Sequence, residues 1–317
     1  MPEENSNFSV RDLVGISKPA DTLIKKIARA IEGVHKPNQI KLLAQAEAEA
    51  AITKAKADAE VAIIKANSDV QIRELQQRTL ERFMNEETKK QKNIEDITNQ
   101  AVTLLSENAD AERMDDDWIT NFFDKARIVS DKEMQELWSR VLAGEANIPG
   151  SFSKRTVNQL SDLDKKEAEL FTKLCRFTTD ISGNDYRPTP LIFDIKSEIY
   201  TNNGIRFDEL LHLESIGLIK CEFKDGYLLL ELPKKIRVVY HNQQIDLEMS
   251  KEENNELSIG DVLLTSVGEQ LASICKITPL HGFAEYLLEK WKGHNPILTT
   301  YSTEGCQDDN NPQLAQK

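Results

Sequence analysis

Residues 38–107 contain neither proline nor glycine, the two residues that most often interrupt a helix. The stretch "AQAEAEAAITKAKADAEVAIIKANSDVQIRELQQRTLERF" consists mostly of residues with high helix propensity. If fully helical, residues 38–107 would extend on the order of 100 Å at 1.5 Å per residue. Apolar residues three and four apart are typical of a coiled-coil seam. Such residues here are Ile52, Ala55, Ala59, Ala62 and Ala66.

A long helix with an alanine seam buries little area per turn, and burial rather than propensity stabilises most helices. We therefore expect residues 38–107 to pair, either with another protein, most simply a second copy of the chain, or by folding back on themselves. The alternatives are a solvated single helix and a hairpin broken near Asn85 or Asn93.

Residues 1–37 are predicted to form an arm followed by an amphipathic helix. Apolar residues at helical spacing lie on one face, with lysine and arginine away from it. The ordinary interpretation is a packing helix. The alternative is that residues 17–36 lie on a membrane surface as part of a membrane-active effector.

Residues 108–180 bring aromatic side chains and are predicted to form a helical bundle. Helix N-caps are expected at Asp116 or Asp117 and at Ser130, where serine followed three residues later by glutamate is a capping-box pattern. In "WSRVLAGEANIPGSFSKRT" a helix is expected to end near Gly144 and to restart at Ser151 or Ser153. This stretch is predicted to be a tight corner between two helices.

Residues 181–295 show a mixed pattern of short strands and helices. Hairpins are expected at Asp225-Gly226 and across Asn242-Gln243. The order helix, hairpin, helix indicates a small winged-helix-like α+β domain, and residues 296–317 resemble a disordered tail. The predicted fold is therefore mainly α, with a long helical stalk, a helical bundle and this α+β domain.

The stretch "DDDWITNFFDKARIVSDKEMQELWSRVLAGEANIPGSFSKRTVNQLSDLDKKEAELF" resembles an uncharacterised bacterial family classed as a domain of unknown function. The most specific part is the LWSRVLAGE–PGSFSKRT signature. Related modules are similar to helical parts of phage-defence and abortive-infection proteins. The resemblance implies no catalytic residues and only a loose connection to phage defence.

One pattern in the sequence is typical of a metal-dependent nuclease. Glu222 and Lys224 have the spacing of the ExK half of a metal-dependent nuclease site, and Asp194 could supply the second carboxylate. On a strand, Glu222 and Lys224 would share one face. Because ExK occurs often by chance, an exposed strand beside a turn is the simpler interpretation. The three acids Asp115, Asp116 and Asp117 could also bind a divalent cation, but consecutive acids at a helix start point in different directions, so a capping role is expected instead. The sequence indicates no cofactor.

The predicted corner between two helices in "WSRVLAGEANIPGSFSKRT" could also bind a partner through exposed side chains. If the corner carries function, its partner-binding residues would be Trp138, Phe152, Lys154 and Arg155. If it is structural, changes there alter stability rather than activity. We expect the structural role.

Charge and cysteine usage restrict the remaining function classes. A net charge of −13 repels phosphate backbones. The predicted helix "FDELLHLES" carries no arginine or lysine, so no duplex-DNA binding is expected. Four scattered cysteines indicate reduced thiols in a cytoplasmic protein, with Cys175 in the core. The expected function is a non-enzymatic assembly or adaptor component, and the nuclease and the membrane effector are the alternatives.

Overall fold

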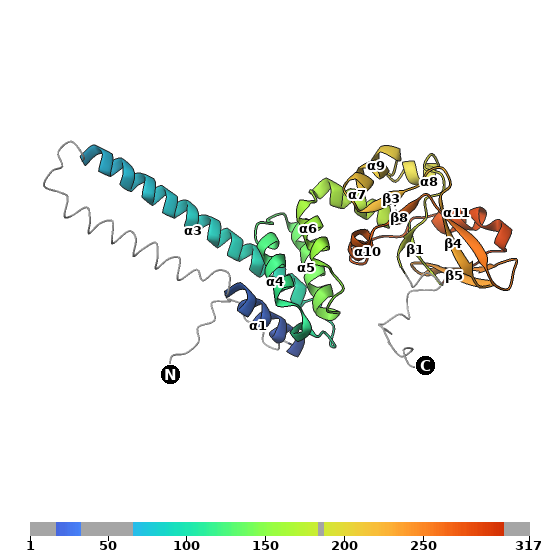
Figure 1. The fold of residues 1–317 in the computed structure, drawn as a ribbon, viewed down its shortest axis with the longest axis horizontal. Coiled ribbons are helices and arrows are strands. Elements are labelled where there is room, and N and C mark those ends of the chain that lie inside the picture. The colour runs from blue at the N-terminus through green and yellow to red at the C-terminus, as the bar shows by residue number, and fades with distance from the viewer. Residues whose placement is uncertain (1–16, 33–65, 183–186, 301–317) are drawn as a thin grey trace. The chain divides into compact units, whose positions relative to one another are not determined.

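The computed structural model describes residues 17–32, 66–182 and 187–300 of the 317-residue chain. The chain forms two compact units, residues 1–162 and 163–317. The fold is mixed α+β: the described part of the first unit is helical, and the second unit combines helices with a five-stranded sheet (Figure 1). The five-part division expected from the sequence stays a prediction.

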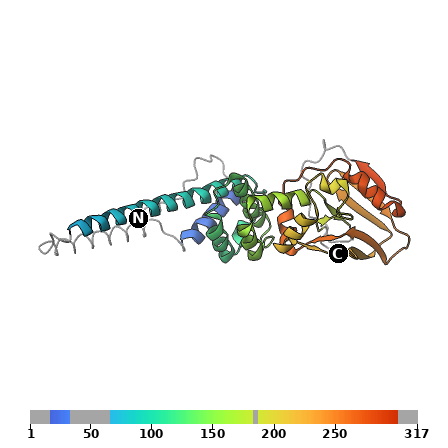
Figure 2. The same ribbon diagram turned by 90° about the horizontal axis from the view of Figure 1, so that it is seen from above.

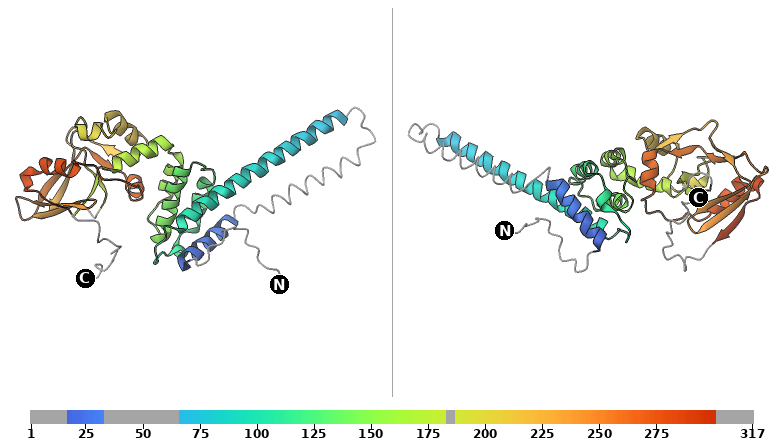
Figure 3. Two further views of the ribbon diagram at one scale, coloured as in Figure 1. Left: turned by 180° about the vertical axis from the view of Figure 1, so that it is seen from behind. Right: turned by 60° about the horizontal axis from the view of Figure 1, so that its bottom comes forward.

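The first unit is built from helices that pack around the aromatic residues of the sequence signature. They are α1 (Lys18–Glu32), α3 (Ala66–Val102), the 3₁₀ helix η2 (Ala111–Arg113), α4 (Asp116–Ala126), α5 (Lys132–Asn147) and α6 (Lys154–Asp162). The C-terminal part of α3 packs against α5, and α4 packs against both α1 and α6 (Figure 3). The side chains of Trp118 and Trp138 both contact Phe122, with ring centroids 5.1 Å apart in each pair.

The prediction of a long helix is confirmed over the described residues 66–102. The helix α3 passes through Asn85 and Asn93 without interruption, so the alternative of a hairpin broken near either residue is wrong. It ends at Val102, a few residues earlier than expected. Residues 38–65, with most of the alanine seam, lie outside the described residues.

The amphipathic helix predicted near the N-terminus is α1, and it is a packing helix. Its apolar residues Ala20, Leu23 and Ile27 are buried. Lys26 lies beside that face, and its ammonium group donates a hydrogen bond to the Glu112 carbonyl oxygen. The face that would lie on a membrane is thus already covered by protein. None of the helices in the described ranges is long and apolar enough to cross a membrane.

Two predicted helix caps are corrected by one residue each. Asp115, rather than Asp116 or Asp117, caps α4 and accepts a 2.7 Å hydrogen bond from the N–H three residues later. Asp131, rather than Ser130, caps α5 and accepts hydrogen bonds from two first-turn N–H groups. In each case the residue before the first helical one is an aspartate, whose charge also interacts favourably with the helix dipole.

The second unit contains the helices α7 (Lys165–Cys175), α8 (Glu198–Thr201), α9 (Phe207–Ser215), α10 (Ser266–Ala272) and α11 (Phe283–Lys290), and the 3₁₀ helix η3 (Lys292–His294). Its strands are β1 (Thr178–Ile181), β2 (Thr189–Pro190), β3 (Ile219–Cys221), β4 (Tyr227–Leu232), β5 (Lys235–Tyr240), β6 (Gln243–Glu248), β7 (Asn255–Gly260), β8 (Val262–Leu264) and β9 (Ile297–Thr300). The antiparallel sheet has the order β2-β1-β5-β6-β9, and α11 packs on β6 and β9 (Figure 2).

One of the two predicted hairpins is confirmed. The strands β5 and β6 pair directly, with Tyr240 opposite Gln243. The hairpin at Asp225-Gly226 is wrong, because β3 pairs with β8 and β4 pairs with β7. A turn signal specifies a local chain reversal but not the partner of each strand. Here the distant strands β7 and β8 bring buried apolar residues, such as Leu257 and Val262, to the ladders.

The winged-helix-like order is corrected for the same reason. Six strands, β3 to β8, separate α9 from α10, where the prediction had two hairpins and four strands between these helices. The first part of the predicted tail is also corrected, since residues 297–300 form β9 and pair with β6, whereas residues 301–317 lie outside the described residues. The core of this unit is an aromatic cluster in which Phe177 contacts Tyr200 and Phe283.

Candidate functional site

The predicted partner-binding residues of the corner divide into buried and exposed ones. Trp138 has no exposed surface and Phe152 is 4% exposed, so neither presents a surface to a partner, and that part of the prediction is corrected. Both are large apolar side chains that fill the space between α4 and α5. Lys154 and Arg155 are exposed in the first turn of α6. The Lys154 ammonium lies 3.5 Å from the Asp115 carboxylate, which offsets its charge.

A buried glutamate holds the corner together. Both carboxylate oxygens of Glu145 accept backbone hydrogen bonds, from the N–H of Gly150 at 2.7 Å and from that of Phe152 at 2.8 Å. The Trp118 indole N–H donates to the Phe152 carbonyl oxygen at 2.7 Å. Burial raises the pKa of Glu145, and the hydrogen bonds from Gly150 and Phe152 act in the opposite direction. The backbone polar groups of the corner are therefore used internally.

Glycine is required at two points of this corner. A Cβ atom on Gly144 would lie 2.5 Å from Cε2 of Phe152, so the ring packs directly on the α5 backbone. Gly150 has a φ of +94°, which disfavours any other residue. The helix α5 continues past Gly144 to Asn147, so the expected helix end at this glycine is wrong. Gly144 provides close approach rather than termination, and Ser153 caps α6 as predicted, accepting from the Thr156 N–H.

The structure does not build the predicted nuclease geometry. The strand β3 ends at Cys221, and Glu222 and Lys224 lie in the turn that follows, so strand alternation does not place them on one face. Asp261 is near Asp194 and Glu222, and burial followed by these two charges raises its pKa. Within residues 17–32, 66–182 and 187–300, no group of three or more histidine, cysteine, aspartate or glutamate residues is placed to hold a metal ion.

Three exposed large apolar residues of the first unit lie on α3. Leu75, Leu80 and Met84 are 57%, 43% and 39% exposed, and no residue from 73 to 92 is buried. This half of α3 extends beyond the other described helices of its unit (Figure 2). Isolated helices in water are marginal even with good propensity, so a segment of this length normally packs on another one. Leu80 and Met84, on neighbouring turns of this helix, therefore mark a face that the other described helices leave exposed.

This face continues the buried face of the same helix. Residues alternately three and four apart form one line along α3. They are Leu80, Phe83, Glu87, Lys90, Ile94, Ile97 and Ala101. The last three are buried within the first unit, whereas Leu80 is exposed and Phe83 is half-buried. We call Leu80, Phe83 and Met84 the open face of α3.

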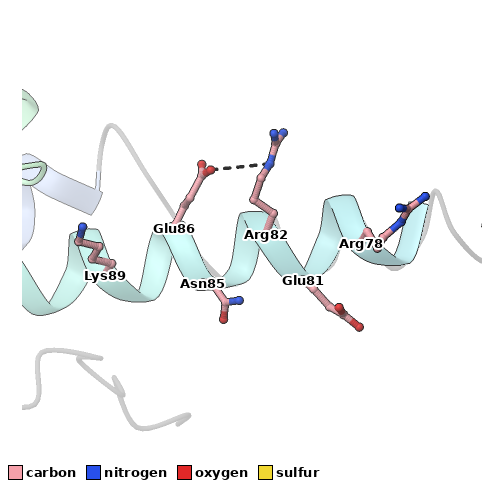
Figure 4. Close-up of a pocket in the computed structure, with 6 residues that line it drawn as sticks. All are labelled: Arg78, Glu81, Arg82, Asn85, Glu86 and Lys89. Carbon is pink, nitrogen blue, oxygen red and sulfur yellow. Dashed lines mark ion pairs between the residues drawn. The ribbon is translucent and has the colours of Figure 1, made fainter. Parts of the chain in front are cut away.

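The other side of this half of the helix is charged. Figure 4 shows the residues of α3 that line a shallow hollow along it, namely Arg78, Glu81, Arg82, Asn85, Glu86 and Lys89. Arg82 Nε lies 3.7 Å from Glu86 Oε1. At about 100° per residue, this charged stripe faces away from Leu80 and Met84. It carries both signs of charge, and the described residues that line it all belong to one helix.

A buried polar network fixes the rotation of α3 at its base. Asn93 is 5% exposed, and its Nδ2 donates to the Arg127 carbonyl oxygen at 2.9 Å. Gln135 of α5 donates to Asn93 Oδ1 at 3.1 Å and to the Val129 carbonyl oxygen at 2.8 Å. A buried amide that loses such partners is costly, so α3 cannot turn about its axis without breaking the network. The direction of the open face is therefore set by the first unit.

An ion-pair cluster adds to this anchor. The Asp96 carboxylate accepts from the Lys132 ammonium at 2.6 Å and from that of Lys92 at 3.0 Å. Burial alone would raise the pKa of Asp96, but the two lysines outweigh it and lower the pKa below its ordinary value. Lys132 belongs to α5, so this contact also joins α3 to α5.

The sequence interpretation missed Glu145 and the open face. The three- and four-residue spacing of apolar residues between Leu80 and Ala101 was the sequence signal for the open face. The coiled-coil seam was instead assigned to the alanine-rich residues 52–66. Glu145 had no sequence signal of its own, because its partners are backbone N–H groups five and seven residues away.

Comparison with known proteins gives a family and no function. A search of curated proteins and a search of solved structures each found no match. A family model described as "Protein of unknown function (DUF2806)" matches residues 77–288, more than half of the chain. The match covers most of α3, the corner and most of the second unit. The chain therefore belongs to the DUF2806 family.

Proposed function

We propose that this protein is a non-enzymatic assembly component that associates with a second copy of itself through the open face of α3. The observation that carries the proposal is the exposure of Leu80 and Met84 on a helix whose base is held rigidly by the first unit. A rigid helix presents its contact residues with little ordering cost on binding.

The occupant we propose is a second copy, because the charges beside the open face suit self-association. Glu87 and Lys90 continue the line of Leu80 and Phe83 along α3, so two such helices can align with opposite charges in register. The chain as a whole carries a net charge of −13, which would repel a second copy over most other surfaces. The coiled-coil stalk predicted for residues 38–107 belongs to this proposal.

A sedimentation experiment on the full chain tests the proposal. We expect the parent to sediment as an oligomer and Leu80→Glu combined with Met84→Glu to sediment as a monomer, because both changes place charge in the contact. Asn85→Glu on the charged stripe is the matched control and should retain the oligomer. A parent that sediments as a monomer at every concentration would contradict the proposal.

The other two functions receive no support from a specific observation. The nuclease lacks the strand geometry that Glu222 and Lys224 needed, and the membrane effector needs the apolar face of α1 that is buried. We expect no magnesium-dependent cleavage of DNA or RNA by the purified chain. The loose resemblance to phage-defence proteins extends the proposal to that setting, and a plaque assay with the parent and the Leu80→Glu, Met84→Glu variant tests this extension.

A further inference from the structure

The strand β4 of the second unit has one edge that no other described strand pairs with. Its other edge pairs with β7. The strand β7 has contacts on both sides, because Gly260 also forms a parallel bridge with Ile192. In addition, the Trp291 indole N–H donates to the Ser258 carbonyl oxygen at 3.2 Å. The free edge of this two-stranded ladder is therefore on β4, where backbone N–H and C=O groups can pair with another extended chain.

Two exposed leucines lie beside this free edge. Leu228 and Leu230 of β4 are 50% and 59% exposed. Leu228 is opposite Ser258, which is also exposed. The residue between the two leucines, Leu229, is instead opposite the buried Leu257. Since side chains two apart on a strand point to the same side, Leu228 and Leu230 form one apolar strip on the outer face of the ladder.

The charges of the ladder favour a basic segment over a second copy. The strands β4 and β7 carry the exposed Glu231 and Glu256, and neither strand contains lysine, arginine or histidine. Lys234, which follows β4, is paired with Glu252 at 2.6 Å. A second copy of β4 would bring the same acidic strand, and the net charge of −13 adds to that repulsion. A segment that carries lysine or arginine beside apolar residues is complementary to the ladder in both respects.

We propose that the free edge of β4 docks an extended segment of another protein in which apolar residues alternate with lysine or arginine. The backbone of the segment pairs with β4, its apolar side chains pack on Leu228 and Leu230, and a basic side chain lies near Glu231. The φ of +57° at Glu231 and the register shift there end the regular ladder, so the docking site is short. This surface belongs to the second unit and does not rest on self-association through α3.

Fluorescence anisotropy with the full chain tests this surface. The probe is a short fluorescein-labelled peptide of alternating valine and lysine, and the control peptide has glutamate in place of lysine. We expect saturable binding of the lysine peptide and no binding of the glutamate peptide. Leu228→Ser combined with Leu230→Ser should weaken binding by about tenfold or more, because the apolar contact is lost while the charge of the chain is unchanged. Glu231→Gln should make the binding less sensitive to salt.

Two further variants provide the controls. Ile297 is 66% exposed on β9, the edge strand of the five-stranded sheet, so Ile297→Ser tests whether any exposed edge binds the peptide. It should bind like the parent. Leu80→Glu combined with Met84→Glu should also bind like the parent, which separates this surface from the open face of α3. Hydrogen exchange should slow at residues 228–230 when the peptide is bound, and not at residues 297–300.

Four results would overturn the proposal. They are no binding of the lysine peptide, equal binding of both peptides, unchanged affinity in the Leu228→Ser, Leu230→Ser variant, and a loss of affinity in Ile297→Ser as large as in that variant. Sedimentation of the same double variant adds a further check. If the parent is an oligomer and this variant is a monomer, the β4 edge binds a second copy and the proposed basic segment is wrong.

Discussion

The packing of Phe152 on Gly144 makes a quantitative prediction about the corner. Phe152 is 4% exposed, and its truncation to alanine leaves a cavity between α4 and α5. Buried Phe→Ala changes cost about 3–5 kcal/mol. Gly144→Ala would place a methyl group 2.5 Å from the ring edge, and such overpacking costs about 1–3 kcal/mol. These two changes act on the same contact.

The double variant Gly144→Ala, Phe152→Ala tests whether both changes act through the contact between these two residues. With the ring removed, the alanine methyl at residue 144 enters the vacated space, so its cost should largely disappear. The double variant should therefore lose about 1–3 kcal/mol less than the sum of the two single losses. If the losses simply add, the two residues do not share a contact and the structural account of the corner is refuted.

Tryptophan fluorescence during urea denaturation measures these free energies of unfolding for the first compact unit alone. Trp118 and Trp138 lie in the first unit, and Trp291 lies in the second. A Trp291→Phe background therefore leaves a signal that reports only on the unit containing the corner. A loss of cellular function by Phe152→Ala with unchanged unfolding would contradict the structural role and return the corner to the list of partner-binding sites.

Three further predictions concern single groups. Asp131→Ala should cost about 1 kcal/mol in the same urea assay because it removes the cap of α5, whereas Asp131→Asn should cost less. Gly260→Ala should lower the thermal midpoint, since a Cβ atom would lie 2.2 Å from the Ile192 carbonyl oxygen at a φ of +91°. The raised pKa of Glu145 favours the folded protein fully below its ordinary value of 4.5, and this contribution is lost as the pH rises through the folded-state pKa. Glu145→Gln does not titrate, so urea denaturation should show a larger stability difference from the parent near pH 4 than near pH 7, and an equal difference would contradict the pKa shift.

Local signals predicted the helices well. The N-caps of α4, α5 and α6 lie at a predicted residue or next to one, and α9 coincides with the predicted helix "FDELLHLES", because capping signals act within a few residues. The capping errors at Asp115 and Asp131 were shifts to a neighbouring residue with the same chemistry. The corner was correctly predicted as a helix joint, although the position of Gly144 inside α5 depends on the Phe152 ring and could not be seen from spacing alone.

Long-range pairing was not predictable in the same way. The strands β3 and β4 follow one another in the sequence, yet each pairs with a strand that comes later in the chain. Their partners are chosen by the burial of residues such as Leu257, which local turn signals do not encode. The candidate site was predicted in part: pairing along the long helix was expected, but the open face became visible only when burial distinguished Leu80 from Ile94.

Photo-crosslinking at residue 80 tests the central claim of self-association most directly. The full chain would carry a benzophenone amino acid in place of Leu80, with an Asn85 replacement as the control on the charged stripe. Equal amounts of isotopically light and heavy protein would be mixed before irradiation, so that mass spectrometry distinguishes links between chains from links within one chain. The account predicts light–heavy links from residue 80 and few from residue 85. Links from residue 80 that lie only within one chain, or equal linking from both positions, would contradict it.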